Sequence, residues 1–303
     1  MLGQRMGFLE VELGPTATRL KEAVRDHFNA CRDGFYGLPL WKIFPTAAYR
    51  KLMRSEETLY EIISSMVEPA MEQSEDTCPV GAVQSVLMSV LRRDELDVRE
   101  KKSTIIDFIA AGIHTIGNST AILLHLVATH PHVQQRLYEE ILEFTPANEP
   151  LTTRHLQSAT YLKACVQESF RLVSTAALLA RITSEDMELS GYFVPAGSVV
   201  LCHLREACND ERNFVRANEF LPERWVPKEA AKLGLVPHFP FLVAPFGFTR
   251  RICPGKKFAE LEMSLFLAKT VRRFELSCTA PLQLQFEFLL TPSGEMPIVF
   301  RDR

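Results

Sequence analysis

One cysteine in this sequence has neighbours that could give its sulfur a chemical role. Cys253 lies in "FGFTRRICPGKKFAELEMSLF", residues 246–266, among two glycines, two arginines and two lysines. The segment after it reads as a helix, and the free amides and positive dipole end at a helix start favour thiolate over thiol. The cationic side chains that add to this bias are Arg250, Arg251, Lys256 and Lys257.

This stretch alone leaves three roles open for Cys253: metal ligand, catalytic nucleophile or incidental surface cysteine. Gly247 and Gly255 remove side chains on both sides of the sulfur, which lets a large flat group approach the backbone. A nucleophile would want a histidine base, and no histidine lies nearer in sequence than His238. The neighbours therefore favour the ligand role without excluding the other two.

Three further motifs hold side chains that could pair or line a cavity. In "ESFR", Glu168 and Arg171 are three residues apart and share a helix face, where a solvated surface pair is the ordinary outcome. In "FLPERW", Arg224 could reach a carboxylate from a loop. In "AGIHT", His114 and Thr115 stand within a long apolar segment, so they must be hydrogen-bonded or line a cavity.

Helices dominate the elements that must position these residues. Ser103 is expected to cap the longest apolar helix, and Pro131 to open the next one in its first turn. The hydrophobic periodicity predicts helices over residues 16–34, 55–73, 103–130, 131–144 and 159–173.

In the last third of the sequence, helical periodicity gives way in places to the alternating pattern of short strands. Residues 187–204 predict short strands, and residues 282–302 predict a terminal hairpin around the Pro-Ser-Gly turn at 292–294. Residues 72–82 are expected to form a surface loop. The helix after Cys253 is expected to use one apolar face, made of Phe258, Leu261, Leu265 and Ala268. The prediction is a mainly α protein with small β-sheets, forming one domain over residues 1–303.

Composition excludes several classes of protein. The 303 residues are 47% hydrophobic and 23% charged, with a net charge of −3, so a packed core is expected and a nucleic-acid partner is not. The seven cysteines include no C-x-x-C pair, which argues against a disulfide framework or a zinc ribbon. No apolar run approaches the ~18 or more residues that a membrane span needs, and no targeting segment is visible.

In their order along the chain, the motifs resemble those of the cytochrome P-450 (haem-thiolate monooxygenase) superfamily. The family pattern runs A-G-x-[DE]-T, E-x-x-R, P-x-R-[WF] and then F-x-x-G-x-R-x-C-x-G. Here the four motifs read "AGIHT", "ESFR", "PERW" and "FGFTRRICPG". The resemblance covers essentially the whole chain, which looks like the C-terminal portion of a longer member that carries further N-terminal helices.

The resemblance implies haem as cofactor, with Cys253 as the thiolate ligand of the iron. Arg251 then matches the arginine that pairs with a haem propionate, and Arg181 looks like a second propionate partner. Phe246 matches the aromatic residue that packs beside the ligand. The glycines Gly247 and Gly255 fit close approach of the haem. A buried ion network that holds the cysteine loop is implied for Glu168, Arg171 and Arg224.

Two positions depart from the family pattern. Thr115 matches the threonine that helps to deliver protons to iron-bound oxygen, but His114 stands where an acid is usual. A histidine can shuttle protons near neutral pH, or it can be a spectator within the helix. Thr249 stands where the cysteine loop usually has glycine, and a β-branched residue strains the loop if that position needs φ > 0.

"CPGKKFAELEM" resembles the mitochondrial branch of the superfamily, which implies a location on the matrix side of the inner membrane. Lys256, Lys257 and Lys163 then form a basic patch for an acidic [2Fe–2S] ferredoxin of the adrenodoxin type. Membrane association is implied for the full-length protein.

Within that branch, "DFIAAGIHTIGNST" is most similar to the arthropod enzymes that hydroxylate the steroid ecdysone to 20-hydroxyecdysone with O2. Another mitochondrial-type steroid or sterol hydroxylase is the alternative. A different class of protein is also open: a truncated isoform that cannot hold haem and does not catalyse.

Overall fold

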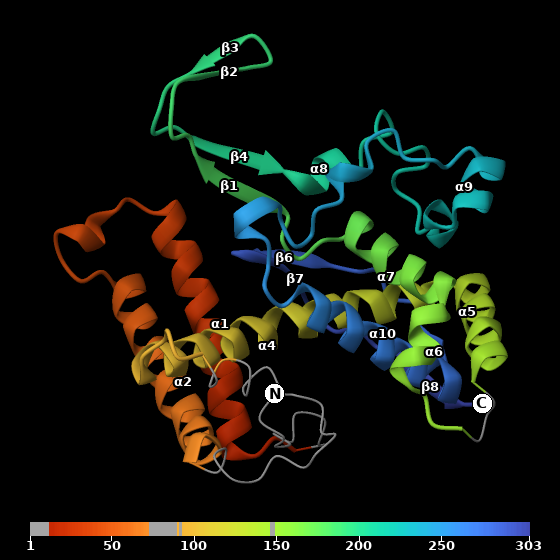
Figure 1. Cartoon of the computed structure of the whole chain (residues 1–303), viewed down its shortest axis with the longest axis horizontal. Coiled ribbons are helices and arrows are strands. Elements are labelled where there is room, and N and C mark those ends of the chain that lie inside the picture. The colour runs from red at the N-terminus through yellow and green to blue at the C-terminus, as the bar shows by residue number, and fades with distance from the viewer. Residues whose placement is uncertain (1–11, 73–89, 91–92, 146–148) are drawn as a thin grey trace. The chain divides into compact units, whose positions relative to one another are not determined.

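The chain divides into two compact units, residues 1–117 and residues 118–303. The computed structural model describes residues 12–72, 90, 93–145 and 149–303 (Figure 1). The predicted loop at 72–82 therefore lies outside the described residues except for its first position. Most of the described chain is helical and the sheets are small, as predicted. The single domain expected for residues 1–303 stays a prediction.

The first unit is built on two helices that pack along each other, α1 (Pro15–Tyr36) and α2 (Ala47–Glu72), joined through a short 3-10 turn, η1 (Leu40–Lys42) (Figure 1). Residues three and four apart on each helix form the apolar stripe that meets the first turns of α4 (Val98–Thr129). The buried members of this core are Leu20, Ala23, Val24, Leu59, Ile62, Ile63, Ile105 and Ile106.

The predicted end of α1 and the predicted start of α4 both need correction. α1 does not end at Gly34 but runs two residues further, because the amide of Gly37 donates to the carbonyl of Asp33 at 3.1 Å and closes the last turn. α4 does not begin at Ser103 either. The amide of Glu100 donates to the Asp97 carboxylate at 2.8 Å, and the amide of Asp97 donates to the Glu100 carboxylate at 2.9 Å. This reciprocal capping starts the helix five residues before Ser103.

By length and composition, α4 qualifies as a helix that could cross a membrane, which the sequence reading had not expected. Polar residues interrupt the apolar segment of this helix, but its average hydropathy is still high enough for a span. Length and composition do not by themselves distinguish a membrane span from a core helix. In this structure residues 122–128 of α4 are all buried.

The second unit contains the remaining helices. Pro131 begins α5 as predicted, and Glu140 of that helix accepts hydrogen bonds from the amides of Tyr161 (2.7 Å) and Leu162 (2.8 Å). This carboxylate therefore satisfies the first turn of α7 from a neighbouring helix. The helices are α5 (Pro131–Phe144), α6 (Thr153–Ser158), α7 (Thr160–Leu172), α8 (Leu204–Cys208), α9 (Pro227–Leu233) and α10 (Lys256–Arg273).

Four antiparallel strand pairs complete this unit in the described residues. The pairs are β1 (Leu178–Ile182) with β4 (Val199–His203), β2 (Met187–Leu189) with β3 (Tyr192–Val194), β5 (Phe274–Ser277) with β8 (Val299–Asp302), and β6 (Leu284–Glu287) with β7 (Leu289–Pro292). The strands predicted within 187–204 are confirmed. Ser190 and Gly191 turn the β2–β3 hairpin with φ of 51° and 83°.

Two further predictions about the C-terminal region are wrong in detail. The β6–β7 hairpin turns at Phe288 (φ 68°), whereas Pro292 ends β7 and the last strand returns to β5. The buried face of α10 is also not the predicted one, because Phe258 and Leu261 are exposed. Of the four predicted residues only Ala268 is buried, and it lies with Ala259, Met263, Leu267 and Val271 on the side where α5, α6 and α7 pack.

Candidate functional site

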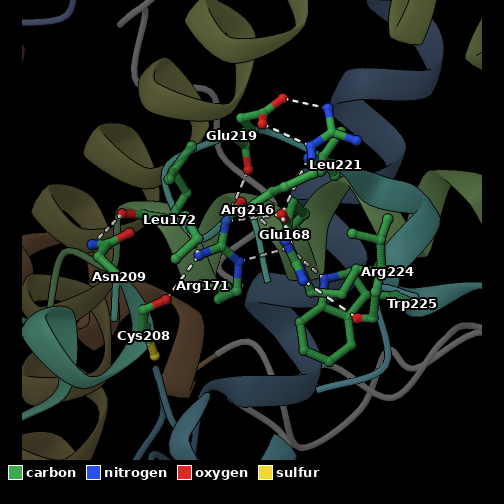
Figure 2. A network of polar contacts seen from close by, with 12 residues as sticks. Glu168, Arg171, Leu172, Cys208, Asn209, Arg216, Glu219, Leu221, Arg224 and Trp225 are labelled. Atoms are coloured by element: carbon green, nitrogen blue, oxygen red, sulfur yellow. Dashed lines mark hydrogen bonds and ion pairs between the residues drawn. The ribbon is translucent and has the colours of Figure 1, made fainter. Parts of the chain in front are cut away.

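Glu168 and Arg171 on α7 form an ion pair that is fully removed from water. Nε and Nη2 of Arg171 each donate to one oxygen of Glu168 at 2.9 Å, which gives the two-point geometry of a strong guanidinium–carboxylate pair (Figure 2). Both side chains have 0% exposure. The solvated surface pair that the spacing alone would give is therefore not what the structure shows.

The remaining three donors of Arg171 tie distant segments of the chain to α7. Nη1 donates to the carbonyls of Cys208 (2.8 Å) and Ala217 (2.6 Å), and Nη2 donates to the carbonyl of Glu219 (2.9 Å) (Figure 2). With the two bonds to Glu168, all five N–H groups of this guanidinium are satisfied. One side chain thus holds α8 and the loop that follows it.

Arg224 brings a second guanidinium to the same carboxylate. Its Nε donates to Glu168 at 3.4 Å, and Nη2 donates to the carbonyls of Val215 (2.9 Å) and Arg216 (3.2 Å). The indole of Trp225 donates to the other Glu168 oxygen at 2.8 Å. Burial lowers the pKa of Arg224 below its usual value, and the attraction of Glu168 opposes that shift.

One aromatic ring serves both cations. The guanidinium carbons of Arg171 and Arg224 lie 5.5 and 5.7 Å from the ring centroid of Phe214, which is fully buried. Cation–π contact adds to the backbone carbonyls that balance two positive charges against one carboxylate. Sequence reasoning missed Phe214 and Trp225. The tryptophan stands in "PERW" beside a predicted site residue, whereas no motif marks the phenylalanine.

The network connects to the segment that carries Cys253. The Cys208 thiol donates to the carbonyl of Leu242 at 3.4 Å, and Phe170, next to Arg171 on α7, meets Phe246 edge-on at 5.1 Å. The Cys253 loop is then closed by its own backbone, because the amide of Cys253 donates to the carbonyl of Phe246 at 2.8 Å. Two contacts therefore stabilise the cysteine loop: the aromatic contact with α7 and the hydrogen bond within its own backbone.

Two residues of this loop have left-handed backbone conformations. Gly247 has φ 73° and Thr249 has φ 56°. Glycine adopts this conformation without strain, so Gly247 is unstrained. A β-branched residue such as Thr249 is strained in the left-handed region by roughly 1–2 kcal/mol. The condition under which Thr249 was expected to strain the loop is therefore met.

Cys253 differs from the buried cysteines of the described chain in its access to solvent. It is exposed and free, two residues before the N-cap Gly255 of α10, where no side chain caps the first turn. Cys165 and Cys208 are buried, and burial raises the pKa of Cys208 to about 11 and that of Cys165 well above its usual value. Metals bind the thiolate form, so the raised pKa values and the burial of Cys165 and Cys208 make them poor ligands. The sulfur of Cys253 is accessible to a ligand-binding partner from solvent.

The surroundings of Cys253 suit a large apolar group that carries anionic substituents. Phe248 and Ile252, in the same loop as Cys253, are 42% and 46% exposed and so present apolar side chains to solvent. The side chains of Arg250 and Arg251 are exposed in the same turn. A haem has this combination of an apolar ring and anionic propionates, so the residues present fit it.

Arg181 is the predicted site residue on β1. A side chain at Gly247 would come within 4.0 Å of Leu179 on the same strand, so β1 runs beside the cysteine loop. Arg181 is exposed and its Nη1 donates only locally, to the carbonyl of Ala180 at 2.8 Å.

The three predicted docking lysines lie on two helices that pack together, α7 and α10. Lys256 approaches the Phe246 ring at 5.9 Å and Glu260 at 4.0 Å. Lys163 donates to the carbonyl of Gln157, and Lys257 is exposed.

His114 and Thr115 belong to the first unit. The hydroxyl of Thr115 donates to the carbonyl of Ala111 at 2.7 Å, within its own helix. The imidazole of His114 stacks on Phe28 of α1, with ring centroids 4.8 Å apart and planes 23° from parallel.

Comparisons with known proteins agree with these features. The sequence profile of the cytochrome P450 family matches residues 1–298. Ecdysone 20-monooxygenase of Drosophila melanogaster is 42% identical over 310 residues, which cover 100% of this chain and 57% of that protein. The protein named probable cytochrome P450 12b2, mitochondrial, of the same organism is 31% identical over 306 residues, which cover 97% of this chain and 56% of that protein. The crystal structure of the cytochrome P450DA heme domain matches with a TM-score of 0.81 at 20% identity, over 100% of this chain and 64% of that chain.

The chain belongs to the cytochrome P450 family, and its fold is that of P450 haem domains. Members of this family use haem with a cysteine thiolate as ligand. Among the relatives, ecdysone 20-monooxygenase and a mitochondrial P450 match nearly the whole chain. The chain spans little more than half the length of these curated relatives.

We expect Glu168→Gln to be strongly destabilising. The substitution keeps the shape but leaves two buried guanidinium groups without their carboxylate, which costs about 3–5 kcal/mol in a buried network. Urea unfolding followed by circular dichroism measures the loss. The matched control is Glu219→Gln, because Glu219 also pairs with an arginine three residues away, Arg216, but both side chains are 51% exposed. Equal shifts of the unfolding midpoint for the two variants would contradict the central role of the buried pair.

We expect Thr249→Gly to stabilise the protein modestly. Glycine removes the left-handed strain of about 1–2 kcal/mol and gives back about 0.5–1 kcal/mol of unfolded-chain freedom. The net gain corresponds to a rise in Tm of about 1–3 °C. Thr249→Ala is the control, because it keeps a Cβ atom at the same φ. An equal rise with alanine would show that the side chain, and not the backbone conformation, causes the effect.

Proposed function

We propose that this chain carries the haem site of a monooxygenase that hydroxylates a steroid with O2 and electrons from a ferredoxin. The specific reaction that we propose is the conversion of ecdysone to 20-hydroxyecdysone. The observation that carries the proposal is the 42% identity with ecdysone 20-monooxygenase over the whole chain. The exposed Cys253, in a loop that a buried ion network supports, is the structural feature on which the chemistry depends.

Cys253 is the proposed ligand of the haem iron. When bound, haem supplies the redox-active iron at which O2 is reduced, and a thiolate ligand favours O–O cleavage. The start of α10 and the exposed arginines beside the cysteine place positive charge near the sulfur. The role of Glu168, Arg171 and Arg224 is to hold the loop that presents this sulfur.

The groups around the cysteine have complementary tasks. Arg251 and Arg181 are exposed cations on the loop and on the neighbouring strand, where each binds one haem propionate. Gly247 and Gly255 leave room for the ring, and Phe246 packs beside the ligand. The motif match assigns to Thr115 and His114 the task of holding and moving protons.

Two segments resemble the pocket-lining regions of the family, residues 173–180 after Arg171 and the turn near Thr291, and they contact each other through their backbones. The amide of Leu290 donates to the carbonyl of Thr175 at 2.8 Å, and the Thr175 hydroxyl lies 3.3 Å from that of Ser119. Thr291 beside them is buried, and its hydroxyl has no hydrogen-bond partner among the described residues. A steroid that carries hydroxyl groups suits apolar walls with isolated polar atoms.

The electron donor and the location follow from the mitochondrial relatives. A ferredoxin of the adrenodoxin type is the proposed partner, with Lys256, Lys257 and Lys163 as the basic surface that it meets. The proposed location is the matrix side of the mitochondrial inner membrane, with membrane association of the full-length protein. The mitochondrial names among the relatives support this part of the proposal.

A reduced, CO-bound absorption spectrum tests the haem site. We expect the haem-reconstituted chain to show a thiolate-type Soret band, and Cys253→Ser to lose that band because the ligand is gone. Cys202→Ser is the matched control, since Cys202 is also exposed and free. A chain that takes up no haem would support the non-catalytic alternative, and a thiolate band in Cys253→Ser would contradict the ligand assignment.

Turnover of the haem-loaded protein tests the substrate. With ferredoxin, its reductase and NADPH, we expect ecdysone to be converted to 20-hydroxyecdysone, as measured by mass spectrometry. A reducible, haem-loaded protein that leaves ecdysone unchanged but hydroxylates another steroid or sterol would overturn the specific assignment and support the related hydroxylase.

The lysine surface predicts a dependence on ferredoxin concentration. We expect Lys256→Glu and Lys257→Glu to raise the KM for ferredoxin severalfold, with little change in the limiting rate at saturation, because charge complementarity mainly accelerates association. Lys232→Glu on α9 provides an exposed-lysine control. An unchanged KM for ferredoxin in both Lys256→Glu and Lys257→Glu would show that these lysines do not contribute to ferredoxin docking.

A further inference from the structure

A further set of contacts, outside the ion network of the site, surrounds the carboxylate of Glu223. This residue lies in the 3-10 turn η3 (Pro222–Trp225). One of its oxygens accepts a hydrogen bond from the hydroxyl of Tyr161 at 2.7 Å and another from Nη1 of Arg136 at 3.3 Å. The side chain of Glu223 is only 15% exposed. A carboxylate that is largely removed from water needs such partners, so its position is restricted.

Arg136 on α5 connects this set to two neighbouring elements. Its guanidinium carbon lies 3.9 Å from the ring centroid of Tyr161, and its two terminal nitrogens donate to the two oxygens of Glu229 on α9. Burial raises the pKa of Tyr161 above its usual value, so the hydroxyl stays protonated and donates to Glu223. Four elements, α5, α7, η3 and α9, are therefore joined at this guanidinium.

Two residues of α7 fix η3 at separate points along that helix. Tyr161 and Glu168 are seven residues apart, about two helical turns, so they lie on the same face of α7. Tyr161 holds Glu223 at one point. At the other, Glu168 accepts from Arg224 at 3.4 Å and from the indole of Trp225 at 2.8 Å (Figure 2). A slide of η3 along α7 would break both sets of bonds, so together they determine its position.

Trp225 connects the position of η3 to the cysteine loop. Trp225 packs against a small buried cluster, and Leu242 and Val243 pack against the same cluster. Val243 stands three residues before Phe246, where the cysteine loop begins. The indole and the residues that lead into the loop therefore share one packing site. The cluster consists of Cys208, Phe214 and Ala217.

We propose that Glu223 is a positioning residue for Cys253. Held by Tyr161 and Arg136, Glu223 fixes η3 along α7, and Trp225 on η3 then supports the segment that enters the cysteine loop. The inference rests on the proposed haem function and adds a support to the one that the buried ion pair provides. Glu223 touches neither haem nor substrate in this proposal and acts only through Trp225.

The first test needs neither haem nor substrate. The chain has two tryptophans, so the indole N–H signal of Trp225 in proton NMR is assigned by its survival in Trp41→Phe. Its bond to a carboxylate is charge-assisted and holds this proton downfield. We expect the signal to move upfield in Tyr161→Phe, which removes only the hydroxyl that holds Glu223, and to move further in Glu223→Leu. Glu223→Gln keeps an oxygen acceptor for that hydroxyl and should restore most of the shift.

The matched control for both tests is Gln134→Leu on α5, two residues before Arg136. Gln134 is buried, and its amide group binds the backbone of Leu276 on β5 at 2.8 and 2.7 Å. Its loss lowers stability without removing a contact of η3, so the indole signal should stay in place. An indole signal that stays in place in Tyr161→Phe as well would overturn the proposal. Tyr161→Phe decides this even if Glu223→Leu does not fold, because it keeps the ring that Arg136 contacts.

The second test follows the sulfur in the haem-loaded protein. One urea titration measures the loss of the thiolate-type Soret band of the reduced CO complex, and another measures the loss of helix by circular dichroism. We expect Tyr161→Phe to lower the midpoint for the thiolate band more than the midpoint for the helices, because the cysteine loop loses its support before the helices unfold. Gln134→Leu should lower the two midpoints equally.

The outcomes separate the proposed function from the positioning role. If the unchanged protein gives no thiolate band, the proposed function fails and the link between Glu223 and Cys253 is overturned with it. If the band is present but Tyr161→Phe lowers both midpoints equally, as the control does, the function stands and the positioning role is overturned. An upfield indole signal together with an early loss of the band supports both.

Discussion

The structure of the second unit depends on keeping three charged groups out of water at low cost. Glu168, Arg171 and Arg224 are all buried, and each would be expensive to desolvate alone. The cost is offset because one carboxylate accepts from both guanidinium groups and from Trp225, while backbone carbonyls take the remaining donors. Most of these carbonyls belong to the end of α8 and to the loop that follows it, so satisfying the charges also determines the path of that loop.

The same constraint reaches the cysteine loop through short steps. The carbonyl of Cys208 accepts a hydrogen bond from Arg171, and its thiol donates to the carbonyl of Leu242. Phe170 on α7 packs on Phe246. Between these contacts, the backbone from Phe246 to Cys253 is left-handed at two positions, Gly247 and Thr249. The strain at Thr249 is tolerated because the surrounding contacts hold the loop from outside.

Sequence reasoning predicted most of the helices and the candidate site, but it misplaced details that depend on partners far along the chain. The start of α4 depends on a reciprocal bond between Asp97 and Glu100, which competes with the equally plausible cap at Ser103. The core face of α10 depends on which neighbouring helices pack on it, so Phe258 could not be excluded from that face by periodicity. The β6–β7 turn at Phe288 contradicts the usual preference for a Pro-Ser-Gly turn.

The sequence by itself determined which chemistry is available. Its residue types and their order placed Cys253 in a cationic, glycine-flanked segment before a helix, and local propensity determined most helices around it. Only the tertiary structure decided that the Glu168–Arg171 pair is buried rather than solvated, because the same spacing is compatible with either environment. It also decided that Trp225 and Phe214 complete that network and that Phe28 faces His114. Such contacts join residues whose separation along the chain carries no periodic signal, so packing alone selects them.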